Sequence, residues 1–439
     1  MTEFLPEDSF RLFFPSPWDM LVYMTQTTEI PAGGFRARAR CDELGIAPYS
    51  DQTDGLFRPY LGPAHRATIG RLAQWMDQAG MSVETDATGN IIGHYDAATP
   101  GAPVLLIGSH VDSVRDGGRY DGMLGVTLGI ETVAYFHERG LRLPFAIEVI
   151  GFGDEEGSRF PTYMMGSRSA AGLSQQIDDT VTDRDGISLR QALDDWGLDV
   201  SRFATARRDN VLAYVEAHIE QAPHLERADL PLGLVRGIAS QYRFRVTLTG
   251  EADHAGTAMH ERRDALAAAA EAISAIERIG AQDPVDLVTT VGWLEVENGA
   301  PNIVPGKVVL TVDIRAVTPG VREDAAQQVS DALQAICTRR RIRLDIERIQ
   351  DLAGALCDER LTGLLGRAVE ERQGSMPPML LSQAGHDAMI MAHLAPMTML
   401  FIRCKGGISH NPAESVDDAD VEAAHQAMVT FVTRLGETM

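Results

Sequence analysis

Apolar residues in the first half of the chain fall into runs of two kinds, one with a helical period and one typical of strands. Residues 64–79 and 124–139 have helical spacing, and each run ends at a glycine, a common helix stop. Short, continuous apolar runs at 104–107 and 145–152 predict buried strands. Strands that alternate with helices indicate an α/β layer with a largely parallel sheet.

The pattern changes after about residue 236. Residues 242–249 alternate between apolar and polar side chains, as a half-exposed strand does. Helical and extended segments then follow in the order α-β-β-α-β, over residues 263–279, 287–294, 308–315, 327–340 and 342–349. Together these segments predict a ferredoxin-like α+β module.

Residues typical of catalytic sites occur on both sides of this module, which therefore interrupts another domain. We expect a catalytic domain formed by residues 1–236 and 352–439, with residues 237–351 inserted into it. A chain of 439 residues is also too long for one ordinary core.

Charge and cysteine usage narrow the class of protein. The net charge of −23 disfavours nucleic acids and anionic membranes as partners, and no stretch of 18 apolar residues predicts a membrane span. The four cysteines form no C-x-x-C pair, which is typical of free thiols in a reducing compartment. The first residues are acidic and lack the basic region of a signal peptide. We therefore expect a cytoplasmic enzyme.

Five side chains have the chemistry and the placement of metal ligands: His110, Asp121, Glu156, His218 and His410. His110 ends the first strand run, Glu156 follows the second, and Asp121 lies between them in a glycine-rich loop. Imidazole with carboxylate suits zinc or manganese better than calcium. Each motif alone is weak, because such residues also occur in turns and at helix starts. Their coincidence predicts a metal site.

Seven motifs match a known family in order. The chain resembles the two-metal amidohydrolases that include N-carbamoyl-L-amino-acid hydrolase, β-ureidopropionase and allantoate amidohydrolase, within the aminoacylase-like metallopeptidase superfamily. The resemblance runs from about residue 64 to the C-terminus. Its motifs are Gly-Ser-His-Val-Asp, Gly-Gly-Arg-Tyr-Asp-Gly, Glu-Glu-Gly-Ser-Arg-Phe, His-Ile-Glu-Gln, Asp-His-Ala-Gly-Thr, Gly-His-Asp-Ala and Gly-Ile-Ser-His-Asn-Pro-Ala-Glu. It implies a zinc-peptidase-like catalytic domain, with the module acting as a lid and dimerisation domain.

The resemblance also implies roles for the ligands. His110 and Glu156 would hold different metals, Asp121 would bridge both, and His218 and His410 would complete the two sets. The metals would be two divalent ions per subunit, Mn²⁺ or Zn²⁺, with Co²⁺ or Ni²⁺ also compatible.

Glu155 would be the general base that takes a proton from the attacking water and delivers it to the leaving nitrogen. His254 would stabilise the oxyanion, from its own subunit or from across a homodimer formed by the module. Asp112 would fix the tautomer of His110. Asp387 would likewise contact and orient the ligands without binding a metal itself.

Substrate contacts implied by the family come mostly from the module. Arg315 would grip a substrate carboxylate through two parallel hydrogen bonds. Further contacts are expected from Gln221, Arg243, Asn302 and His386. Gln383 and Ala384 depart from the family's usual Gly-Ala pair, which leaves the identity of the substrate open.

The function implied is hydrolysis of a ureido C–N bond, with allantoate as the favoured substrate, giving ureidoglycine, ammonia and CO2. The alternatives within the class are an N-carbamoyl-L-amino acid or a β-ureido acid, and all of these are small ureido carboxylates. A metallo-exopeptidase or aminoacylase shares the metal ligands. A non-catalytic binding protein would have lost Glu155 or a ligand, and all are present.

Overall fold

The computed structural model describes residues 33–439. The predictions about the first residues, including the expected absence of a signal peptide, lie outside this range. One part of the structure is a nine-stranded sheet in the order β1-β2-β4-β3-β5-β16-β6-β14, with β15 also paired to β6. Its strands are β1 (Ser82–Thr85), β2 (Ile91–Tyr95), β3 (Val104–His110), β4 (Ala146–Phe152), β5 (Val211–Ile219), β6 (Leu232–Ile238), β14 (Ala355–Leu356), β15 (Met379–Ser382) and β16 (Met397–Ile402).

The expectation of a largely parallel sheet is correct only for its centre. β4, β3, β5 and β16 run parallel to one another, and β15 runs parallel to β6. The pairs β1–β2, β2–β4, β16–β6 and β6–β14 are antiparallel. A short connection joins β1 to β2, and a strand that returns through a tight turn must run antiparallel. The central strands are buried on both faces, which explains their continuous apolar sequences.

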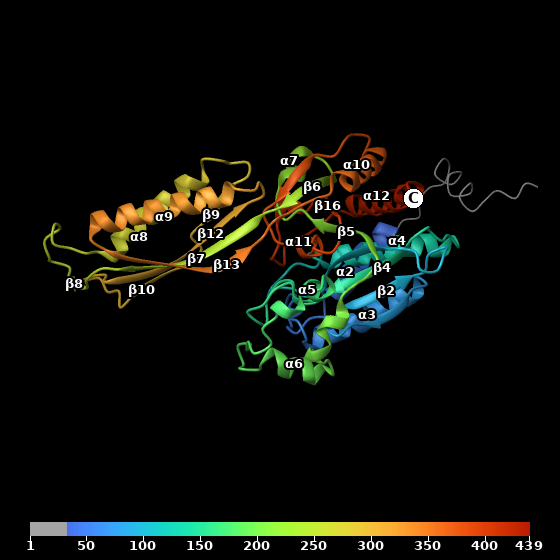
Figure 1. Ribbon diagram of the computed structural model, residues 1–439, viewed down its shortest axis with the longest axis horizontal. Helices are drawn as coiled ribbons and strands as arrows, with labels where there is room; N and C mark the ends of the chain where they lie inside the picture. Colours follow the sequence, from blue (N-terminus) through green and yellow to red (C-terminus); the bar gives the residue numbers. More distant parts are fainter. Residues whose placement is uncertain (1–32) are drawn as a thin grey trace, which may run out of the picture.

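Helices cover both faces of this sheet (Figure 1). One layer packs around α4 and shares a core with the strands; it comprises α2 (Gly33–Leu44), α3 (Pro63–Gln78), α4 (Met123–Glu138), α10 (Glu359–Gln373) and α12 (Asp418–Glu437). The opposite face carries α5 (Met165–Ala170) and α11 (Asp387–Met391). The remaining short helices are α6 (Leu189–Trp196), α7 (His224–Ala228), η1 (Ser174–Gln176), η2 (Val200–Ala206) and η3 (Lys405–Gly407).

Residues 240–352 build a second, five-stranded sheet in the order β10-β12-β7-β13, with β9 paired to β12. Every pairing in it is antiparallel. Its elements are β7 (Ser240–Thr249), α8 (Ala265–Gly280), β9 (Val288–Thr290), β10 (Leu294–Glu297), β12 (Lys307–Ala316), α9 (Val321–Arg340) and β13 (Arg343–Leu352). These elements appear in the predicted β-α-β-β-α-β order, with one predicted strand split at Gly292 into β9 and β10.

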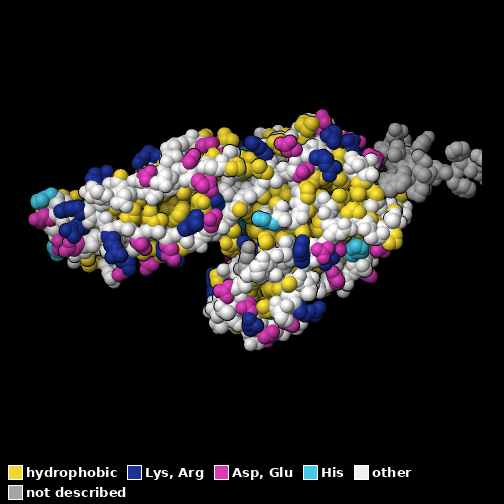
Figure 2. All heavy atoms as spheres, in the orientation of Figure 1, with side chains coloured by type: hydrophobic (Ala, Val, Ile, Leu, Met, Phe, Trp, Pro, Cys, Tyr) yellow, Lys and Arg dark blue, Asp and Glu magenta, His cyan; other side chains and the backbone are white. Residues whose placement is uncertain are grey.

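The second sheet extends away from the first, with α8 and α9 together on one of its faces (Figure 1). Its far end carries the two-stranded pair β8 (Asp253–His254) and β11 (Ile303–Val304). The space-filling view shows an open notch between this part and the lobe that contains α5 and α6 (Figure 2). Within residues 33–439, no helix is both long enough and apolar enough to cross a membrane.

Candidate metal centre

The five predicted ligands meet at the carboxyl ends of the central parallel strands, where ligands bind in open α/β sheets. His110 is the last residue of β3, and His218 lies near the end of β5. Glu156 follows β4, His410 follows β16, and Asp121 lies just before α4. The parallel strands therefore bring together residues that lie up to 300 positions apart in the sequence.

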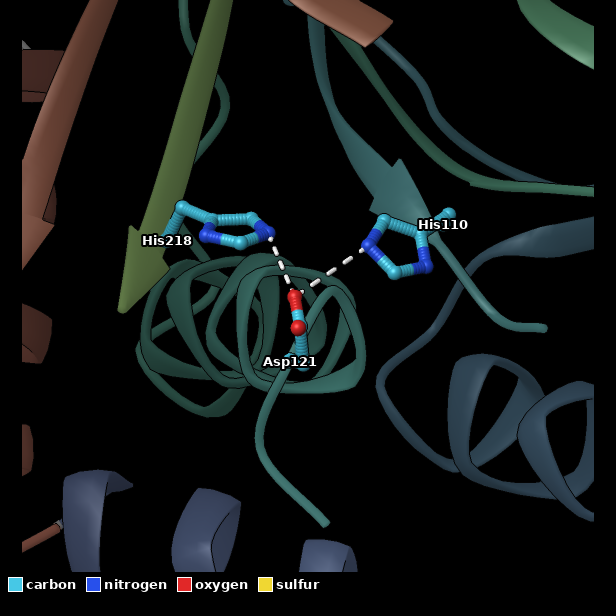
Figure 3. A group of neighbouring side chains, drawn as sticks. All are labelled: His110, Asp121 and His218. Atoms are coloured by element: carbon cyan, nitrogen blue, oxygen red, sulfur yellow. Dashed lines mark ion pairs between the residues drawn. The ribbon is translucent and has the colours of Figure 1, made fainter. Parts of the chain in front are cut away.

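Asp121 is shared by two groups of ligand-type side chains. Its Oδ1 lies 3.5 Å from His110 Nε2 and 3.1 Å from His218 Nε2, and Figure 3 shows both imidazoles pointing at this oxygen. Its Oδ2 lies 3.2 Å from His410 Nε2, which is itself 3.3 Å from Glu156 Oε1. In each group, the possible ligand atoms lie within 4.8 Å of one another, close enough to hold one cation.

The donor chemistry of these groups fits cations. Nδ1 of His110 lies 3.1 Å from the backbone oxygen of Asp112, and Nδ1 of His218 lies 2.9 Å from that of Ile219. When Nδ1–H donates to a carbonyl, Nε2 of a neutral imidazole presents a lone pair. That lone pair faces an Asp121 oxygen, and a cation bound between the two acceptors would satisfy both of them.

The backbone around the ligands is held in uncommon conformations. Gln221 and His410 have left-handed φ values of 57° and 54°, which a non-glycine residue adopts at some cost. Gly122 has a φ of 65°, and a Cβ there would lie 2.4 Å from the His110 ring. The glycine that follows Asp121 is therefore required by the close approach of His110.

Asp112 has a different role from the one predicted. Its carboxylate Oδ1 is 3.9 Å from His110 Nδ1, too far for a hydrogen bond, and the tautomer is instead set by its backbone oxygen. The two carboxylate oxygens accept hydrogen bonds from the backbone N–H groups of Glu155, at 3.1 Å, and Glu156, at 3.2 Å. The side chain thus positions the proposed base and a ligand together.

Burial and neighbouring charges together control the ionisation of these groups. Burial raises the pKa of Glu155 well above its ordinary value, and the negative charge of Glu156 adds to this effect. Hydrogen bonds with Asp121 and Glu156 raise the pKa of His410 to about 11. Burial also raises the pKa of Asp387 to about 8, and Glu216 contributes in the same direction. A raised pKa helps Glu155 to hold a proton, which suits a residue that must both take up and deliver one.

Two predicted substrate residues lie against the ligands. Gln221 Nε2 donates to Asp121 Oδ2 at 2.9 Å, next to the Ser409 hydroxyl, which donates to the same oxygen at 2.6 Å. His386 is buried, packs edge-to-face on His218 at 4.4 Å and hydrogen-bonds to the Ser382 hydroxyl. Both positions indicate support of the ligands, and contact with substrate stays a prediction for each.

The module residues divide into two places. Arg243 and Arg315 lie side by side on β7 and β12, at the end nearest the first sheet, where Arg315 Nη1 donates to the Gln383 carbonyl at 2.6 Å. His254 and the segment of Asn302 lie at the other end, on and beside the β8–β11 pair. The eight residues of β12 that separate the two ends span roughly 26 Å at about 3.3 Å per residue. The structure therefore does not bring His254 to the ligands of its own chain.

Two supporting acids were not singled out from the sequence. Glu414 Oε1 accepts from the backbone N–H groups of Tyr120, at 2.8 Å, and Asp121, at 3.1 Å. Glu216 accepts from the Ser109 and Tyr214 hydroxyls and from a backbone N–H of α11. Donors from separate segments thus fix both oxygens of Glu216, which also forms a possible ligand group with His218 and His386. A charged residue within the apolar strand 211–219 was the available signal.

A family model described as "Peptidase family M20/M25/M40" matches residues 91–434. The chain belongs to this family. It is 40% identical over 407 residues to N-carbamoyl-L-amino acid amidohydrolase of Geobacillus stearothermophilus, covering 92% of this chain and 99% of that one. It is 38% identical over 432 residues to allantoate deiminase 1 of Glycine max, covering 91% and 89%. The predicted family is therefore confirmed.

The fold of this M20-family chain also matches a solved structure. AtUAH in complex with (S)-hydroxyglycine is similar with a TM-score of 0.79 and 29% identity, over 94% of this chain and 100% of that one. That neighbour binds a small molecule, as its name states. The mixed α/β architecture is thus shared along nearly the whole chain.

Proposed function

We propose that this chain is a two-metal amidohydrolase that cleaves a ureido C–N bond in a small carboxylate. The observation that carries the proposal is Asp121, whose two oxygens face two separate ligand groups, as a carboxylate that bridges two metals must. The names of the relatives, allantoate deiminase and N-carbamoyl-L-amino acid amidohydrolase, support this substrate class. Allantoate is the favoured substrate and N-carbamoyl-L-amino acids are the alternative.

Two cations, Mn²⁺ or Zn²⁺, would be held by His110, Asp121 and His218 on one side and by Asp121, Glu156 and His410 on the other. When bound, they would polarise the substrate carbonyl and activate water. Glu155, raised in pKa and fixed by Asp112, would accept the water's proton and return it to the leaving nitrogen. Arg315 and Arg243 would hold the carboxylate, because guanidinium groups match its two oxygens.

The remaining roles concern the module. We propose that residues 237–351 form an inserted lid and dimerisation domain, flanked by the two parts of the catalytic domain. The notch in Figure 2 leaves room for movement of such a lid. His254 and Asn302 lie at its far end, so they would reach a substrate from the partner subunit or after a large closure. A homodimer is the simpler arrangement, because no large movement of each module is required.

The proposal is tested by ammonia release from allantoate, N-carbamoyl-β-alanine and several N-carbamoyl-L-amino acids, each with Mn²⁺ and with Zn²⁺. Chelation is expected to abolish activity and either ion to restore it. Asp121→Ala is expected to lose both metals, measured by elemental analysis, because it removes the shared ligand. Full turnover by metal-free protein, or turnover of none of these compounds, would overturn the proposal.

A further inference from the structure

Four polar side chains gather at one point on the helix-free face of the second sheet. Gln241 and Arg243 come from β7, and Asp313 and Arg315 come from β12. Asp313 pairs across the strands with Arg243, and Arg315 pairs with Gln241. Since alternate residues of a strand share a face, all four side chains project to the same side.

Asp313 joins the two arginines into one cluster. Its Oδ1 accepts a hydrogen bond from Arg315 Nε at 2.8 Å, and its Oδ2 accepts from Arg243 Nη2 at 2.9 Å and from the Gln241 amide. Burial opposes the charge of Asp313, but these hydrogen bonds, led by that of Arg315, hold its pKa below the ordinary value. Asp313 is therefore ionised at neutral pH and restrains both guanidinium groups.

Arg315 keeps donors free for a ligand despite these contacts. Its hydrogen bonds to Asp313 and to the Gln383 carbonyl use three of its five N–H groups. One N–H on Nη1 and one on Nη2 remain available to the oxygens of a carboxylate. The contact with Gln383 also ties this pair to the loop between β15 and α11, the loop that carries His386.

The charges of the cluster set what it can neutralise. Two guanidinium groups and one carboxylate leave one net positive charge. One carboxylate of a ligand balances that charge, whereas a second would be left without a partner near a half-buried site. We propose that Asp313 is a positioning and specificity residue that orients Arg315 and Arg243 and tunes them for ligands with a single carboxylate.

This inference rests on the proposed function, because it takes the ligand to be a ureido carboxylate. The test measures binding by calorimetry to metal-loaded protein in the Glu155→Gln background, so that the expected loss of turnover permits equilibrium. The probes are N-carbamoylglycine, with one carboxylate, its amide, with none, and N-carbamoyl-L-aspartate, with two. Ammonia release by the wild type is measured in parallel with the same three compounds.

Asp313→Asn raises the net charge of the cluster and removes the orientation of its arginines. The affinity ratio of the monocarboxylate to the dicarboxylate is expected to fall roughly ten- to a hundredfold, the worth of one charge-assisted hydrogen bond. Asp313→Glu, which keeps the charge, is expected to retain most of this preference. A merely structural role would weaken all three probes alike and leave their ratios unchanged, which would overturn the inference.

Glu347→Gln is the matched control, because it removes the exposed 2.9 Å pair with Arg245 on the same sheet. Its three affinities are expected to equal those of the starting protein. If Asp313→Asn does not fold, Arg243→Gln removes one positive charge instead, and the affinity ratio of the acid to the amide should fall. An unchanged ratio would overturn the inference.

The two proposals fail in different ways. If the wild type releases no ammonia but the Asp313 variants change the binding ratios as expected, the proposed hydrolysis is wrong and the role of Asp313 stands. If ammonia is released but Asp313→Asn keeps the ratios, hydrolysis stands and the role of Asp313 is wrong. Equal binding of the acid and the amide by protein that keeps Asp313 would also refute the role of Asp313.

Discussion

Replacing Asp112 tests how the loop after β4 is held. Its carboxylate is buried and accepts the backbone N–H groups of two successive residues, Glu155 at 3.1 Å and Glu156 at 3.2 Å. Asp112→Asn preserves the size of the side chain but turns one acceptor into an NH2 group. That NH2 group would face a backbone N–H, so one hydrogen bond is lost and two donors oppose each other.

The magnitude follows from the bonds involved. A hydrogen bond to a charged group is worth about 1.5–3 kcal/mol, and a buried N–H without an acceptor costs about 1–3 kcal/mol. The loop should therefore lose on the order of 2–4 kcal/mol of its preference for the observed conformation. Because Glu156 is a proposed ligand, metal affinity is expected to fall roughly ten- to a hundredfold, as for other residues that support ligands.

The assay is metal affinity at about pH 8, where Asp112 is ionised although burial raises its pKa to about 6. Turnover at saturating metal and the thermal midpoint are measured alongside. Asp286→Asn is the matched control, because Asp286 is also buried and accepts the successive N–H groups of Val317, at 2.6 Å, and Thr318, at 2.9 Å. It should lose similar stability with unchanged metal affinity.

Two outcomes would refute this reasoning. If Asp112→Asn binds metal as tightly as the wild type, the carboxylate does not position Glu156. If Asp286→Asn weakens metal binding as much as Asp112→Asn does, the effect reflects general destabilisation and not the loop.

Three further predictions concern other parts of the molecule. Glu155→Gln should keep the metals and lose roughly two to four orders of magnitude in kcat, and near-normal turnover would remove it from the mechanism. Arg315→Lys keeps the charge but loses the two-point contact, so kcat/KM for a ureido carboxylate should fall roughly ten- to a hundredfold while its amide is unaffected. Burial lowers the pKa of His65 to about 3. In the unfolded state the pKa of His65 is about 6.5, so between about pH 6.5 and about pH 3 the unfolded protein binds a proton that the folded protein does not. Stability therefore falls as the pH is lowered through this range. At about pH 5 the loss of stability is about 2 kcal/mol, measured by urea denaturation, and it should be absent in His65→Asn. His260→Asn, which replaces an exposed histidine, should behave as wild type. The same pH dependence in His65→Asn as in wild type would contradict the assignment.

The local pattern of the sequence was sufficient to predict the type of several elements and their order within the second sheet. Helices α3, α4 and α8 and strands β3, β4 and β12 lie within a few residues of their predicted bounds, because apolar period and glycine stops act over one helical turn or a few strand residues. The sequence also pointed to the candidate ligands, since strands that end in histidine or precede acidic residues place those side chains at a sheet edge.

Other features depend on contacts that the chain makes only when folded. The sequence places Asp112 two residues from His110, yet its carboxylate bonds the loop after β4 because β3 and β4 are parallel neighbours. Glu414 holds Asp121 across 293 positions, and Glu216 gains its three donors from separate segments. The separation of His254 from its own metal ligands likewise follows from the length of β7 and β12. Sequence determined which groups were available, and the packing of the parallel strands and the extension of the second sheet decided which of them meet.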